Sequence, residues 1–92
     1  MIVRISGEGQ FELDDDVAER LNALDNDAVA AVEAGDEPRF TDLFGQILAL
    51  IRSVGSPLAD DDLRGSDVIV PPSDTTFEEA RVEFTGDGLI PG

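Results

Sequence analysis

The side chains in this sequence that could act on another molecule are mainly carboxylates, with some Arg, Ser and Thr. The chain has 21 Asp and Glu and six Arg, and it lacks His, Cys, Lys and Tyr. The usual general base near neutral pH, the Schiff-base amine and the thiolate nucleophile are therefore missing. Paired carboxylates can hydrolyse glycosides, but that chemistry needs a cleft, and no Trp or Tyr is present to stack on a sugar. We predict that the protein is not an enzyme and that it uses no cofactor.

Two runs of three Asp, at residues 14–16 and 60–62, are oxygen clusters of the kind that Ca²⁺ and Mg²⁺ prefer. The second run partly fits the EF-hand loop, but Arg64 falls at the fifth position and Pro71 at the twelfth, where a bidentate Glu is needed. The first run is better explained by capping of a helix N-terminus. The second is better explained as a solvated acidic loop. We predict no metal site.

The net charge of −15 is the strongest signal in the composition. Such a charge repels itself in dilute buffer and destabilises the compact state, whereas molar salt shortens the Debye length to about 3 Å. We therefore predict a halophilic acidic protein that works in a salt-rich cytoplasm. The six Arg are spread along the chain and form no basic patch, so we predict no nucleic-acid partner.

Direct insertion into a membrane is also predicted to be absent. The sequence has no run of about 20 apolar residues that could span a bilayer. Residues 1–6 lack the charged region and long apolar run of a signal peptide. An anionic membrane surface would repel so acidic a chain. We predict a cytoplasmic protein without direct membrane insertion, folded as one domain over residues 1–92.

The hydrophobic pattern predicts an α+β fold. Residues 2–5 and 10–13 are typical of two strands of a β-hairpin around a Gly-containing turn. Two amphipathic helices follow, the first ending near Gly35 and the second ending near Gly55. Their short connection predicts an antiparallel helical hairpin. The Asp-Asn-Asp run at residues 25–27 leaves open whether the first helix frays or restarts there.

The last third of the sequence predicts less regular structure. Residues 58–65 form a loop or a short helical turn, and residues 68–70 form a short strand that two prolines close. Thr76 and Glu79 fit a capping box, which predicts a short C-terminal helix to about Phe84. The Gly-rich segment from residue 86 to residue 92, which we call the tail, is not expected to be helical.

Three apolar residues are candidates for contact with a partner: Leu50, Leu89 and Ile90. Leu50 lies off the main apolar stripe of the second helix, so it is either covered by another element or part of an interface. Leu89 and Ile90 lie in the tail, which either packs within the protein or presents both side chains to a partner. We predict that these residues bind the partner, with the tail as the stronger candidate.

Several segments resemble the PspA-associated (PspAA) family. Residues 1–11 (MIVRISGEGQF) and the LNALD stretch at 21–25 are similar to the first part of these proteins. The SDVIVPPSD block at 66–74, followed by TFEEA at 76–80, resembles the middle signature of the family. The GLIPG ending at 88–92 is similar to the C-terminal sequence of the family. The resemblance covers essentially the whole chain.

The resemblance implies a role beside PspA, a coiled-coil protein that protects the cytoplasmic membrane in the phage-shock-type response to envelope stress. PspAA proteins occur in actinobacteria and haloarchaea, and this acidic chain is similar to the haloarchaeal type. The resemblance implies no catalytic or ligand residue. We expect a non-catalytic accessory or adaptor protein with a PspA-like coiled-coil partner. The alternative is a self-associating regulatory or structural protein with little direct PspA contact, so the question of a homo-oligomer stays open.

Overall fold

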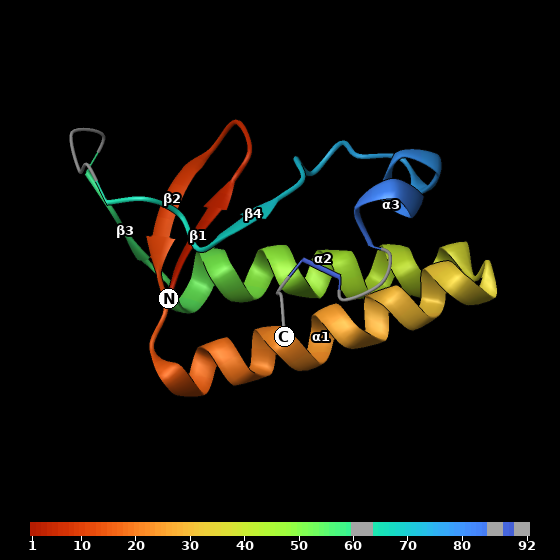
Figure 1. Cartoon of the computed structure of the whole chain (residues 1–92), viewed down its shortest axis with the longest axis horizontal. Helices are drawn as coiled ribbons and strands as arrows, with labels where there is room; N and C mark the ends of the chain where they lie inside the picture. Colours follow the sequence, from red (N-terminus) through yellow and green to blue (C-terminus); the bar gives the residue numbers. More distant parts are fainter. Residues whose placement is uncertain (60–63, 85–87, 90–92) are drawn as a thin grey trace.

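The computed structural model describes residues 1–59, 64–84 and 88–89, and it has the predicted α+β architecture (Figure 1). The elements are β1 (Ile2–Ile5), β2 (Gly9–Glu12), α1 (Asp15–Ala34), α2 (Glu37–Val54), β3 (Ser56–Pro57), β4 (Val68–Val70) and α3 (Phe77–Glu83). The predicted β-hairpin, helical hairpin and short C-terminal helix are confirmed. The Asp run at 60–62 lies outside the described residues. No helix in the described part of the chain is long and apolar enough to cross a membrane.

The described strands form one mixed sheet in the order β3-β2-β1-β4. β1 pairs antiparallel with β2, where Val3 lies opposite Phe11, and parallel with β4, where Val3 lies beside Val68. The carboxylate of Asp67 accepts a hydrogen bond from the Ile2 N–H at 2.8 Å, which fixes the start of the β1–β4 pairing. The sequence predicted the hairpin and the last strand. It did not predict the parallel pairing of β1 with β4.

Side-chain caps set the starts of both long helices. The carboxylate of Asp14 accepts a hydrogen bond from the Val17 N–H at 2.9 Å, and that of Asp36 accepts one from the first turn of α2 at 3.2 Å. Gly35 ends α1 in the left-handed region, at a φ of 70°, where a residue without Cβ is favoured. α1 continues through residues 25–27, so the helix neither frays nor restarts there.

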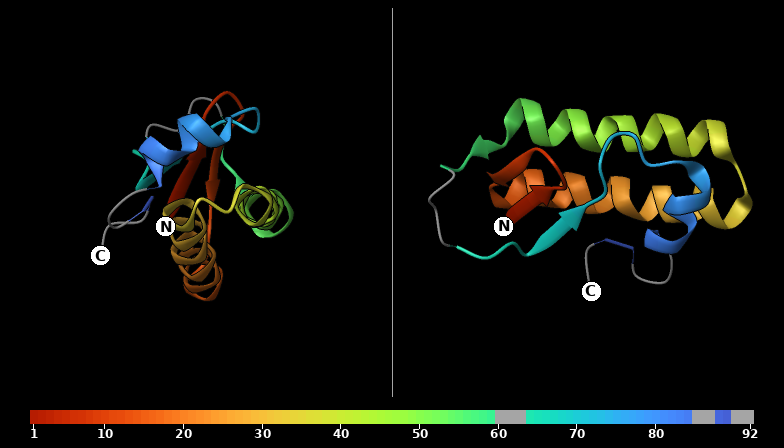
Figure 2. Two further views of the ribbon diagram at one scale, coloured as in Figure 1. Left: turned by 90° about the vertical axis from the view of Figure 1, so that its right-hand side faces the viewer. Right: turned by 90° about the horizontal axis from the view of Figure 1, so that it is seen from above.

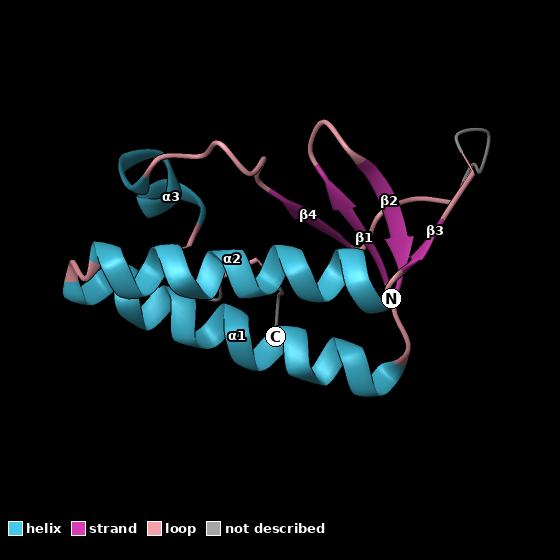
Figure 3. Ribbon diagram, turned by 180° about the vertical axis from the view of Figure 1, so that it is seen from behind, coloured by secondary structure: helices cyan, strands magenta, loops and turns pink. Residues whose placement is uncertain are grey.

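The sheet and α3 lie over the same side of the α1–α2 hairpin (Figures 1 and 2). Viewed from behind, the strands lie towards one end of the helix pair and α3 towards the other (Figure 3). At the α3 end, Phe84 meets Phe40 and Phe44 edge to face, with ring centroids 5.1 and 5.9 Å apart. Such aromatic contacts add to the stability that burial provides. The hydrophobic core therefore extends from the sheet to α3 along one side of the helices.

Candidate functional site

The tail residue Leu89, a predicted partner contact, is held to α1 by its backbone. Its N–H donates to both carboxylate oxygens of Asp25, at 3.0 Å each. Asp25 belongs to α1 and is only 1% exposed. The side chain of Leu89 is half-buried and packs against the hydrophobic core. Ile90, the other predicted tail contact, lies outside the described residues.

Gly88 is the residue that lets the tail come so close to Asp25. Its φ of 78° lies in the left-handed region, which residues with a Cβ disfavour. A Cβ built on Gly88 would lie 2.7 Å from each of the carboxylate oxygens of Asp25. A larger residue at position 88 would clash with the Asp25 carboxylate, which accepts the hydrogen bond from the Leu89 N–H. We call Asp25, Gly88 and Leu89 the tail clasp.

The role of Asp25 was missed in the sequence, although a signal for it exists. Val17 and Leu21 precede Asp25 at four-residue spacing, so Asp25 occupies the next position of a buried stripe. A carboxylate at such a position needs hydrogen-bond donors, because burying it alone is costly. An acidic residue at a core position needs a donor from elsewhere in the chain, and the Gly-rich tail could supply one. This combination could have indicated the tail clasp.

Leu50, the third predicted contact, lies in a shallow groove between α1 and α2. The groove has a volume of about 310 Å³. Besides Leu50, its lining residues are Arg20 and Leu24 of α1 and Gln46, Ala49, Ser53 and Val54 of α2. Leu50 is 8% exposed, whereas Val54, the last residue of α2, is 48% exposed. We call this surface the helix groove.

Small residues form a row beside and within the helix groove on α2. Gly45, Ala49 and Ser53 follow one another at four-residue spacing, and all three are exposed. A Cβ added to Gly45 would meet nothing within 4 Å. Since the distance between packed helices depends on the side chains at the contact, this row allows another helix to approach closely.

The structure does not bring the two predicted contact regions onto one flank of α1. Successive helix residues are about 100° apart around the axis, because a turn holds 3.6 residues. Leu24, which lines the helix groove, and Asp25, which belongs to the tail clasp, therefore point to different flanks of α1. Leu50 and Leu89 belong to these two separate surfaces.

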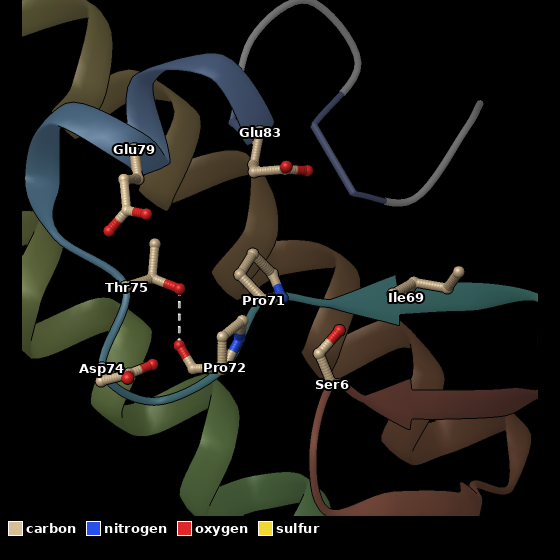
Figure 4. Close-up of a pocket in the computed structure, with 8 residues that line it drawn as sticks. All are labelled: Ser6, Ile69, Pro71, Pro72, Asp74, Thr75, Glu79 and Glu83. Carbon is tan, nitrogen blue, oxygen red and sulfur yellow. Dashed lines mark hydrogen bonds between the residues drawn. The ribbon is translucent and has the colours of Figure 1, made fainter.

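A further hollow, which the sequence did not indicate, lies where β4 leads into α3 (Figure 4). Its volume is about 420 Å³. The carboxylate-bearing residues Asp74, Glu79 and Glu83 line it together with Pro71 and Pro72. In Figure 4 the prolines lie between the α3 carboxylates and strand β1. We call this hollow the acidic cleft.

Other carboxylates make hydrogen bonds within the fold. Glu8 accepts a hydrogen bond from the Arg52 side chain at 2.9 Å, and this bond lowers the pKa of Glu8. The predicted capping box of α3 is confirmed, because the Thr76 N–H donates to Glu79 at 3.0 Å and the Glu79 N–H donates to the Thr76 hydroxyl at 3.2 Å. The hydrogen bond from the Thr76 N–H, and to a lesser extent that from the Thr76 hydroxyl, lowers the pKa of Glu79.

Among the described residues, no group of three His, Cys, Asp or Glu could hold a metal ion.

Comparison with known proteins identifies the family. A family model described as PspA-Associated protein matches residues 1–92. No curated protein and no solved structure matches the chain. The family match agrees with the resemblance of the first, middle and last segments of the sequence. This chain belongs to the PspA-associated protein family.

Proposed function

We propose that this protein is a non-catalytic accessory protein of the PspA envelope-stress response, and that it acts by binding a PspA-like coiled coil. The observation that carries the proposal is the family match over residues 1–92, since the family is described by its association with PspA. The residue inventory supports a binding role, because the chain lacks His, Cys, Lys and Tyr.

The helix groove is the surface that we propose for this contact, and one helix of the coiled coil is its occupant. A helix lying along α1 and α2 would cover Leu50 and Val54. The small side chains of Gly45, Ala49 and Ser53 would let its backbone approach closely. Helices with an apolar face bind apolar grooves in this way in several recognition systems.

Apolar contacts, rather than charge, would supply most of the affinity. The net charge of −15 supports a salt-rich cytoplasm as the working environment. At about 1 M salt the Debye length is about 3 Å, so attraction between distant charges is screened. Burial of apolar surface is not screened and contributes about 25 cal/mol per Å². The exposed apolar part of the helix groove therefore matters more for this contact than the acidic surface.

Leu89 and Ile90 stay in the proposal as secondary contacts. The backbone of Leu89 is held by Asp25, and its side chain packs against the core. Both observations favour a role within the protein for Leu89. Only the exposed part of its side chain is then accessible to a partner. We therefore place Leu50 and the helix groove ahead of the tail, which reverses the order expected from the sequence.

The test compares two exposed alanines, one in the helix groove and one outside it. Ala49→Gln puts a longer side chain into the groove, and Ala30→Gln makes the same change at an exposed position of α1 away from the groove lining. Each variant is titrated with purified PspA from the same organism at about 1 M KCl. We expect Ala49→Gln to lose affinity about tenfold, equivalent to about 1.4 kcal/mol, and Ala30→Gln to bind like the wild type. Circular dichroism checks that both variants stay helical.

Three other outcomes would change the proposal. If PspA does not bind, and the protein instead forms an oligomer that Ala49→Gln dissociates, the protein is a self-associating regulator. If both variants bind PspA as tightly as the wild type, the contact lies outside the helix groove. Deletion of residues 88–92 then tests the tail, and a loss of binding with an unchanged helical signal would identify Leu89 and Ile90 as the anchors. No binding and no oligomer would contradict both functions.

A further inference from the structure

The acidic cleft is built from four separate parts of the fold: Ser6 just after β1, the edge strand β4, the turn after it and α3 (Figure 4). Its volume of about 420 Å³ is near the lower end of the range of ligand pockets, roughly 300–1,000 Å³. The cleft has room for one long side chain and too little for a large cofactor. Its lining decides which side chain that is.

One side of the acidic cleft is apolar. Ile69 of β4 is 60% exposed, and it lines the cleft together with the rings of Pro71 and Pro72. Pro72 is exposed, whereas Pro71 is buried. Covering exposed apolar surface in a concave site with another apolar group contributes favourably to the free energy of binding. The ligand should therefore bring an apolar or flat surface.

The other side of the acidic cleft is negatively charged. Asp74, Glu79 and Glu83 line it, and no described Arg does. In the described part of the chain, Asp74 and Glu83 form no ion pair, and Arg81 of α3 pairs instead with Glu78 at 3.7 Å. The backbone N–H of Thr76, at the start of α3, lowers the pKa of Glu79, which favours the charged form of this carboxylate. The ligand should therefore be a cation.

The sheet edge beside the cleft can guide an extended chain. β4 is an outer strand of the sheet among the described residues. The Ser6 N–H donates to the Val70 carbonyl, so Val70 faces β1 and the alternate residue, Ile69, directs its backbone groups to the open edge. Pro71 and Pro72 have no N–H, so pairing at this edge must stay short. A few residues of an extended partner segment fit such an edge.

We propose that the acidic cleft binds an arginine side chain carried by an extended segment of a partner protein. A guanidinium group can form charged hydrogen bonds with a carboxylate and lay its flat face on an apolar surface, and the cleft lining offers both kinds of surface. The ammonium of lysine is more strongly hydrated and has no flat face. A metal ion suits the cleft less, because no three carboxylates of the described residues are grouped as ligands. The inference does not depend on binding to PspA.

The experiment uses a blocked pentapeptide, Ala-Val-Arg-Val-Ala, and a second peptide with citrulline in place of arginine. Citrulline keeps the shape of the side chain and lacks its charge. Both are titrated into the whole protein at about 1 M KCl, where attraction to the acidic protein as a whole is screened. The methyl resonances of Ile69 report occupancy of the cleft. We expect the arginine peptide to shift them at concentrations at which the citrulline peptide does not.

A pair of double variants separates the cleft from the general negative charge. Asp74→Asn with Glu83→Gln removes the two unpaired carboxylates of the cleft, and Glu19→Gln with Glu33→Gln removes the same charge from exposed positions of α1. We expect the first pair to weaken binding of the arginine peptide by about fivefold or more, and the second pair to leave it unchanged.

Three results would overturn the proposal. Equal shifts with the arginine and citrulline peptides would show that the cleft does not select a cation. Equal weakening by the two double variants would show that the peptide follows the overall charge. A folded protein whose Ile69 methyl resonances do not respond would show that the cleft binds no arginine segment. The native positions of the other methyl resonances serve as the check on folding.

Discussion

The helix groove and the tail clasp occupy two flanks of α1, and different interactions hold them. The groove is a shallow surface around buried Leu50 and exposed Val54. The clasp is a buried carboxylate that binds the backbone N–H of Leu89. Apolar surface accepts many contact geometries, whereas a buried carboxylate needs donors at fixed positions. The groove therefore fits the partner contact that we propose for it, whereas the clasp is a contact within the chain.

Salt should have the largest effect, because it acts on both flanks through the whole charged surface. The melting temperature, followed by circular dichroism, should fall strongly as KCl is lowered from about 1 M to about 0.1 M. At the lower concentration the Debye length grows to about 10 Å, and the net charge of −15 repels itself. An unchanged melting temperature would show that charge repulsion does not limit the stability.

Phe44→Ala should be the most destabilising single substitution in this set, because it removes core that supports both flanks. Phe44 is buried against Phe40 and Phe84. We expect a loss of about 2–5 kcal/mol in the free energy of unfolding, measured with a chemical denaturant. Leu48→Ala, on the same buried side of α2, should fall in the same range. A loss below about 1 kcal/mol would show that the core is centred elsewhere.

Asp25→Ala should separate the two flanks. It leaves the Leu89 N–H without its acceptor, at a cost of about 1–3 kcal/mol. Amide hydrogen exchange at Leu89 should become faster, while the methyl resonances of Leu50 keep their positions. Asp27→Ala, an exposed change in the same helix, is the matched control and should alter neither. A shift at Leu50 would mean that the clasp and the groove are coupled.

Gly88→Ala and Gly45→Ala should have opposite signs. At Gly88 the positive φ and the nearby carboxylate make a methyl group unfavourable, so the protein should lose about 1–2 kcal/mol. At Gly45, inside α2, a methyl group meets nothing within 4 Å and should stabilise the protein by about 0.5–1 kcal/mol. Denaturant unfolding measures both. A Gly88→Ala variant as stable as the wild type would contradict the close approach in the tail clasp.

Glu79→Gln should have the smallest effect, and it tests whether the charged cap of α3, the helix before the tail, contributes to the stability of the protein. The lowered pKa of Glu79 means that its stabilising contribution is present above the ordinary value of 4.5 and is lost as the pH falls through the lower folded-state pKa. The melting temperature of the wild type should therefore approach that of the variant as the pH is lowered. A constant difference between the two would contradict this role.

Local signals made most of the fold predictable. Asp36 and Thr76 marked helix starts because each caps a free N–H within three residues. The parallel pairing of β1 with β4 and the short strand β3 depend on distant contacts, which leave no periodic pattern in the sequence. For the candidate site, Leu50 stood out as an apolar residue off its stripe. Its groove also needs Arg20 and Leu24 from another helix, and that neighbourhood appears only in three dimensions.

The pairing of β1 with β4 also imposes an order in time. Ile2 and Asp67, whose hydrogen bond starts this pairing, are 65 positions apart. The ribosome releases the hairpin and both long helices before it releases β4, so β1 waits with an open edge that carries Val3 and Ile5. An open apolar edge invites pairing with other chains, and contacts between such distant segments slow folding. We expect the nascent chain to be the stage at which this protein is most exposed to aggregation.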